Sequence, residues 1–279
     1  MVKLIKNVAI QFSSWKTDFR VIMALILGSV LLCLNGYSYL KLAVFLRSEI
    51  QAFEMFIICG STGYSFLASY LGNALLLSNA PFTSEMTAYE VLRLGKRRWI
   101  DSRIIYVVSS CFLYSIVLLI ASVLFSATKC SLNFKNEWSS TISELSIRQP
   151  SYILDTFRFA FNQKEYIMTI SPYTAVALTV VCNSMYSVLL SMIIMSVNLL
   201  TEHGFGWIIA SAIHICGYIV YANAGNMFTL KLSLFCHGMP AYYFQQYTGF
   251  SILGTISFVL LVFILLREIC LYASKKTHF

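Results

Sequence analysis

The sequence predicts an all-α polytopic membrane protein, a single transmembrane domain over residues 1–279 with six transmembrane helices. Composition is the first reason: 58% of the residues are hydrophobic, 11% are charged, and the mean hydropathy is +0.73. Soluble domains carry about 25% charged residues. Length is the second reason, because a span needs roughly 20 mostly apolar residues. Six stretches fit this requirement, the fifth being the shortest: 21–40, 52–77, 104–125, 174–200, 206–221 and 250–266.

Basic residues gather near both ends of the chain and in the connection between the second and third stretches. An even number of spans places both termini on one side, and cytoplasmic loops carry the excess of Lys and Arg. We therefore expect a multi-pass protein of the plasma membrane with both termini in the cytoplasm. Because the charge is confined to loops, the net charge of +8 does not indicate a nucleic-acid partner.

Residues 1–20 have the pattern of an amphipathic helix. Apolar side chains recur at spacings of three and four residues, which places them on one helical face: Leu4, Val8, Phe12, Trp15 and Phe19. Basic residues lie mostly off that face, as in helices that lie in the membrane interface. Two interpretations remain open: a simple surface anchor, or a surface helix that also contacts a cytoplasmic partner.

The connection over residues 78–103 is longer than a turn requires. After Pro81, Glu85 and Glu90 fall at the start of a short predicted helix, where the helix dipole favours acids. Basic residues follow them: Arg93, Lys96, Arg97 and Arg98. A basic loop attracted to anionic lipid is one interpretation. A helix presented to a protein is the other.

These features together resemble the permease subunits of type-two ABC exporters. In that family the loop at this position forms a coupling helix that docks on an ATPase, and the matching stretch here is 81–103. The resemblance implies docking through the acidic and basic residues just named, a second permease copy, and ATP bound by the partner ATPase subunits. The chain has no P-loop, because Gly95 and Lys96 are followed by Arg97 and lack the required preceding glycine.

The resemblance also implies a re-entrant helical hairpin over residues 222–249 on the outer side. Gly225, Gly238 and Pro240 interrupt this half-apolar segment. Considered without the resemblance, the segment is better interpreted as an amphipathic loop on the bilayer surface. The outer loop at 126–173 is longer than the smallest family members lead us to expect, which leaves the substrate class open.

Polar residues inside the apolar stretches are candidates for a translocation path, because they are expensive at that depth. His214 in the fifth stretch and Asn183 in the fourth are such residues, and hydrogen bonds between helices are the alternative. Glu54 is expected to reach water at the outer end. Cys130 and Cys236 share the outer side, where they either pair or remain free. No enzyme motif, metal-ligand spacing or cofactor site is present in the sequence.

The expected function is therefore that of a permease, with ATP hydrolysis in a separate chain. The resemblance implies export of a peptide-like or lipophilic substrate, such as an antimicrobial peptide or antibiotic. A stand-alone membrane protein, for example an immunity or sensor protein that binds a toxin without ATP, is the alternative. Co-purification of an ATPase separates the two.

Overall fold

Long helices dominate the computed structural model, which describes residues 2–81, 87–148, 157, 161, 163–223, 230–231, 233–244 and 251–276. Among these residues, five helices are long and apolar enough to cross a membrane. They are α2 (Phe19–Phe45), α6 (Lys96–Ala127), α10 (Pro172–Thr201), α11 (Gly206–Asn223) and α14 (Ile252–Lys276). The prediction of a multi-pass, helical membrane protein is confirmed at this level.

The second predicted stretch, 52–77, is not one helix. It consists of α3 (Glu54–Ser61) and α4 (Gly63–Leu77), and Thr62 between them has an extended backbone with φ −105° and ψ 123°. Glycine, serine and threonine are weak helix formers, and the sequence at the break contains Gly60, Ser61, Thr62 and Gly63. Neither half is long enough to span a bilayer alone, so six crossings remain a prediction in which α3 and α4 make one crossing together.

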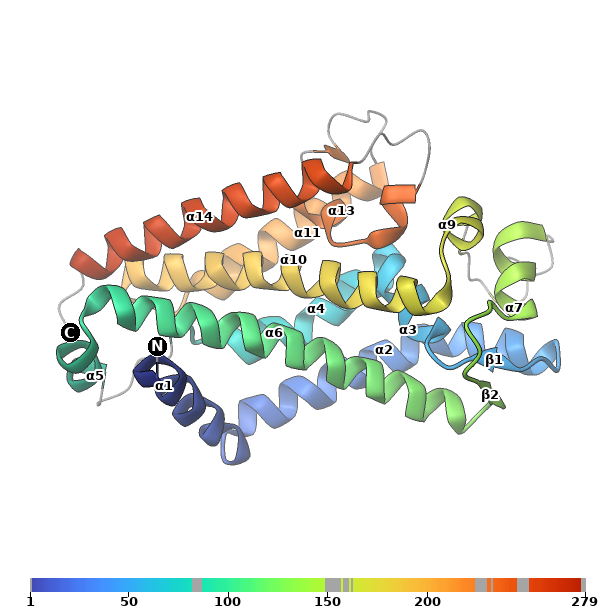
Figure 1. The fold of residues 1–279 in the computed structure, drawn as a ribbon, viewed down its shortest axis with the longest axis horizontal. Helices are drawn as coiled ribbons and strands as arrows, with labels where there is room; N and C mark the ends of the chain where they lie inside the picture. The colour runs from blue at the N-terminus through green and yellow to red at the C-terminus, as the bar shows by residue number, and fades with distance from the viewer. Residues whose placement is uncertain are drawn as a thin grey trace.

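The elements are sorted to two ends of an elongated bundle (Figure 1). The N-terminal helix α1 (Val2–Ser13), α5 (Thr87–Leu94) and the last turns of α14 lie at one end, here called the terminal end. The opposite end, called the loop end, contains the short elements that connect the long helices: β1 (Ile50–Gln51), β2 (Leu132–Asn133), α7 (Ser140–Ser143) and α9 (Lys164–Thr169). β1 and β2 form a parallel two-stranded pair, with Ile50 opposite Leu132.

Helix α10 is the central helix of the bundle. It packs against α6, α14, α11 and α3. In its most apolar stretch 61% of the residues are buried, against 17% in α11 and in α14. Those two helices instead expose large apolar side chains, including Leu253 and Leu260 of α14. Their outward faces have the character of surfaces that contact lipid.

Helices α2, α4 and α6 approach one another closely. The Tyr114 hydroxyl of α6 donates to the Ser69 carbonyl of α4 at 2.7 Å. A Cβ added to Gly72 of α4 would lie 2.7 Å from the Ala24 carbonyl oxygen of α2. Glycine at this position therefore lets α2, α4 and α6 meet, which is how small residues act at helix contacts in membranes.

An N-terminal helix is present and packs on α6, but it is shorter than predicted: α1 ends at Ser13, a 3-10 turn, η1 (Ser14–Lys16), follows it, and Phe19 belongs to α2. Asn7 Nδ2 donates to Ser102 Oγ at 3.1 Å, and Trp15 Nε1 donates to the Tyr106 hydroxyl at 2.6 Å. Asp18 then caps α2 by accepting from the Arg20 backbone N–H at 3.0 Å. The side-chain hydrogen bond from Arg20 holds the pKa of Asp18 below its usual value. The position of this helix in the membrane interface remains a prediction.

The separation of the two ends predicts opposite labelling of two exposed lysine positions. Single cysteines that replace Lys135, between β2 and α7, and Lys275, at the end of α14, should react from opposite sides of the membrane in a cysteine-free background. A membrane-impermeant maleimide applied to intact cells should reach position 135, and position 275 after permeabilisation. Labelling of both from outside would contradict the topology.

Candidate functional site

The short helix α5 presents an apolar and basic face at the terminal end. Its Thr87 and Val91 side chains are buried against the bundle, whereas Tyr89 is 75% exposed and Leu92 is 84% exposed. Gly95 then separates α5 from α6 with φ +78°, a conformation that favours glycine. Because no atom lies within 4 Å of its added Cβ, the backbone conformation, not crowding, requires glycine here.

A buried ion pair holds α5 in place. Arg103 of α6 has a side chain that is 3% exposed, and its Nη2 lies 2.6 Å from Oε2 of Glu90 in α5. Trp99 Nε1 donates to the same oxygen at 3.2 Å, and the guanidinium carbon lies 5.3 Å from the centroid of a Trp99 ring. A buried guanidinium requires a counter-charge, and removing one partner leaves an uncompensated charge. The position of α5 is therefore tied to α6.

The first turns of α6 also contact the two ends of the chain. Asp101 Oδ1 accepts from Arg267 Nη2 of α14 at 2.9 Å. Lys96 Nζ donates to the Lys275 carbonyl at 3.3 Å. With the Asn7 contact to α6 described above, these turns join α1, α5 and α14 at the terminal end.

The predicted docking residues do not share one environment. The side chains of Arg93, Arg97 and Arg98 are exposed and have no ion pair among the residues that the structure describes. Glu90 instead pairs within the chain, and Lys96 is half-buried beside the end of α14. Glu85 lies outside the described residues. Sequence reasoning missed that Tyr89 and Leu92 are exposed, because these two residues belong to one apolar set with Val91 and Leu94 and nothing in the local sequence separates exposed from buried members.

His214 is part of an aromatic cluster between α4, α10, α11 and α13 (Leu234–His237). It is 1% exposed, and its Nε2 lies 3.1 Å from the Leu67 carbonyl oxygen. Since that oxygen can only accept, Nε2 carries the hydrogen, and Nδ1 accepts from the Tyr186 hydroxyl at 2.6 Å. Both ring nitrogens of a neutral imidazole are thus used between helices. Phe66, Tyr70 and Phe235 surround it.

Asn183 faces a helix contact. A Cβ added to Gly60 of α3 would lie 2.6 Å from Asn183 Nδ2, so the two helices meet closely here. Asn183 Oδ1 is buried and has no hydrogen-bond partner among the described residues. A role for His214 or Asn183 in a translocation path remains a prediction.

At the loop end, the expectation that Glu54 reaches water is wrong. Its side chain is fully buried, and it accepts from the Tyr39 hydroxyl at 2.5 Å, from Ser139 N at 2.7 Å and from Gln51 N at 3.1 Å. The connection after α6 folds back over the start of α3 and supplies one of these donors. The carboxyl group therefore joins α2, α3 and the loop end.

Cys130 and Cys236 are both free thiols, so they do not pair in this structure.

The segment 222–249, predicted to form a re-entrant hairpin, is described in part. The described part contains α13 and a 3-10 turn, η3 (Pro240–Phe244), which pack against α10 and α11. Residues 224–229, 232 and 245–250 lie outside the described part. Re-entry of this segment into the bilayer remains a prediction.

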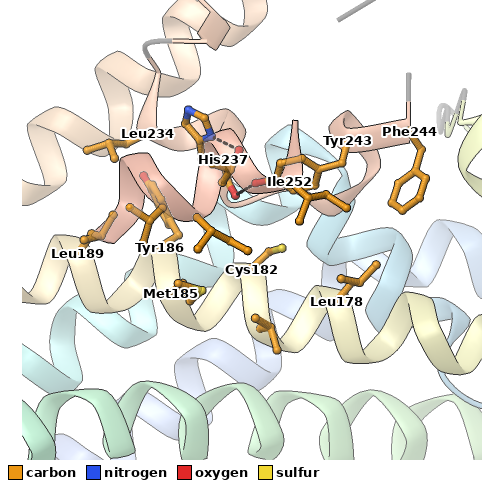
Figure 2. A pocket seen from close by; sticks show the side chains of 14 residues that line it. Leu178, Cys182, Met185, Tyr186, Leu189, Leu234, His237, Tyr243, Phe244 and Ile252 are labelled. Carbon is orange, nitrogen blue, oxygen red and sulfur yellow. Dashed lines mark hydrogen bonds between the residues drawn. The ribbon is translucent and has the colours of Figure 1, made fainter. Parts of the chain in front are cut away.

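A cavity of about 120 Å³ lies between α10, α14 and the segment formed by α13 and η3 (Figure 2). Its walls are mostly apolar, with Leu178, Met185 and Leu189 contributed by α10. The cavity is open on one side, where Ile252 and Ile256 of α14 are also exposed on the surface of the bundle.

Comparison of the chain with protein-family models, with curated proteins and with solved structures finds no match. The resemblance to ABC permeases rests on architecture and on the loop at 78–103.

The buried ion pair predicts that Glu90→Gln loosens α5. The substitution leaves Arg103 buried without an anion, which should cost about 1–3 kcal/mol, less than a fully buried pair because Glu90 is partly exposed. Hydrogen exchange of residues 87–94 should become faster, while exchange in the middle of α10 stays unchanged. Glu268→Gln is the matched control, since its pair with Arg267 is on the surface and its side chain is 62% exposed. Equal hydrogen-exchange rates of residues 87–94 in both variants would contradict the role given to the Glu90–Arg103 ion pair.

Proposed function

We propose that this chain is the transmembrane subunit of an ATP-driven exporter of the type-two ABC class, in the plasma membrane with both termini in the cytoplasm. It would pair with a second permease copy and bind two ATPase subunits at the terminal end. The observation that carries the proposal is the exposed face of α5, held rigidly by Glu90 and Arg103.

The composition of this face favours a protein partner. Tyr89, Leu92 and Arg93 of α5 are exposed, and so are Arg97 and Arg98 in the first turn of α6. Interface centres are enriched in tyrosine and arginine, which often carry most of the binding energy. A loop that serves anionic lipid alone needs basic charge, but it does not need a helix fixed by a buried ion pair.

The contacts of α5 provide a route for mechanical coupling. A displacement of α5 would be passed to α6 through Glu90 and Arg103, and from α6 to α14 through Asp101 and Arg267. When ATP closes the partner subunits, this chain's part is to convert their movement into rearrangement of α6 and α14. The lipophilic or peptide-like substrate rests on the resemblance and on the apolar spanning helices.

Reversing the charge of an exposed pair tests the docking surface. Arg97→Glu with Arg98→Glu should greatly reduce co-purification of the ATPase in mild detergent and leave membrane insertion intact. A single surface pair contributes about 0–1 kcal/mol, so the double reversal, which adds repulsion, is needed for a clear effect. The readout is the ratio of ATPase to permease after affinity purification.

Lys129→Glu with Lys135→Glu is the control for that test. It makes the same charge change on exposed side chains at the loop end, away from α5. A protein interface should respond to the first pair and not to the second. If both pairs lower association with anionic vesicles equally and no ATPase is recovered with the unaltered chain, α5 is a lipid contact and the stand-alone function is favoured.

A further inference from the structure

We propose that the cavity between α10 and α14 binds the end of an acyl chain from a bilayer lipid. This inference does not depend on the exporter proposal, because it rests on the walls and the opening of the cavity alone. It assigns a lipid-binding site to the outer half of the bundle, beside the segment formed by α13 and η3 (Figure 2).

The walls select a hydrocarbon because their polar groups are already used. His237 Nδ1 lies 3.0 Å from Thr255 Oγ1, and its Nε2 lies 2.8 Å from the Lys231 carbonyl oxygen. The Tyr243 hydroxyl donates to the His237 carbonyl at 2.6 Å, and the Tyr186 hydroxyl is bonded to His214. A ligand that brought its own donors or acceptors would lose water without gaining partners.

The opening of the cavity determines where the ligand comes from. Three of the lining residues are also exposed on the outer faces of spanning helices: Val181 is 42% exposed, Ile252 is 49% exposed and Ile256 is 43% exposed. All three are apolar and belong to α10 or α14, so the wall that they form faces hydrocarbon when the helices span a bilayer. An acyl chain can therefore enter sideways without crossing a polar surface.

The size of the cavity limits the site to part of a chain. Its volume of about 120 Å³ is slightly below that of an engineered apolar cavity, about 150 Å³, that stays dry and binds benzene. The end of an alkyl chain fits this space, whereas a headgroup does not. The buried residues Leu189 and Val259, which are 1% and 7% exposed, would contact that end.

Photo-crosslinking with synthetic phosphatidylcholine tests the site in the full-length chain. The protein is reconstituted in vesicles whose lipid has a diazirine at the end of one acyl chain, irradiated and mapped by mass spectrometry. Adducts should form at Leu189 and Val259 despite their burial. Leu118 of α6, which is 5% exposed and does not line the cavity, is the buried control and should give none. The exposed Ile264 should always react.

Two substitutions at one position make the assignment specific. Val259→Phe fills the cavity and should abolish the adduct at Leu189, while the adduct at Ile264 is kept. Val259→Ala enlarges the cavity and should keep or increase the Leu189 adduct, which tests the site even if the larger side chain prevents folding. Val220→Phe on the exposed face of α11 is the matched control and should change neither the adduct at Leu189 nor the adduct at Ile264.

Absence of the Leu189 adduct in the unaltered protein would overturn the proposal. So would a Leu189 adduct that survives in correctly folded Val259→Phe protein, because the chain would then lie elsewhere.

Discussion

The burial of Arg103 is the constraint on which the terminal end depends. A guanidinium that is almost excluded from solvent must meet an anion, and Glu90 supplies it from a different helix. The same first turns of α6 contact α1 through Ser102 and α14 through Asp101. One helix start thus fixes the relative positions of both ends of the chain and of α5. The exposed face of α5 is consequently presented in one orientation, as a docking surface requires.

The loop end also contains a buried ionisable side chain, Glu54, but its burial is compensated in a different way. Glu54 has no cation beside it among the described residues, and three hydrogen-bond donors compensate its burial. Between the two ends, the bundle is held by close helix contacts at glycine and by the neutral hydrogen bonds around His214. Charged contacts are thus concentrated at the ends, where a bilayer would leave room for water, and the interior retains an apolar cavity beside α14.

Apolar runs were sufficient to predict the five long helices, because a run of about 20 apolar residues has the length and composition of a helix that crosses a bilayer. The break in the second stretch was within reach of sequence reasoning, since Gly60, Ser61, Thr62 and Gly63 weaken a helix. The surroundings of Glu54 were not, because Ser139 lies 85 residues away in the chain. Glu90 was assigned to a partner protein because its pairing with Arg103, 13 residues along the chain, depends on how α5 folds back on α6. Local sequence patterns predict the helices, whereas the burial of a side chain depends on how the helices pack.

The central claim is that α5 contacts an ATPase subunit, and a photo-reactive amino acid at Leu92 tests it most directly. This side chain is 84% exposed, whereas Thr87 and Val91 of the same helix are buried. Irradiation in native membranes should crosslink the chain to one soluble nucleotide-binding protein, identified by mass spectrometry. The same residue placed at Tyr64 in α4, which is 63% exposed, should not. Adducts with lipid alone at position 92 would contradict the account.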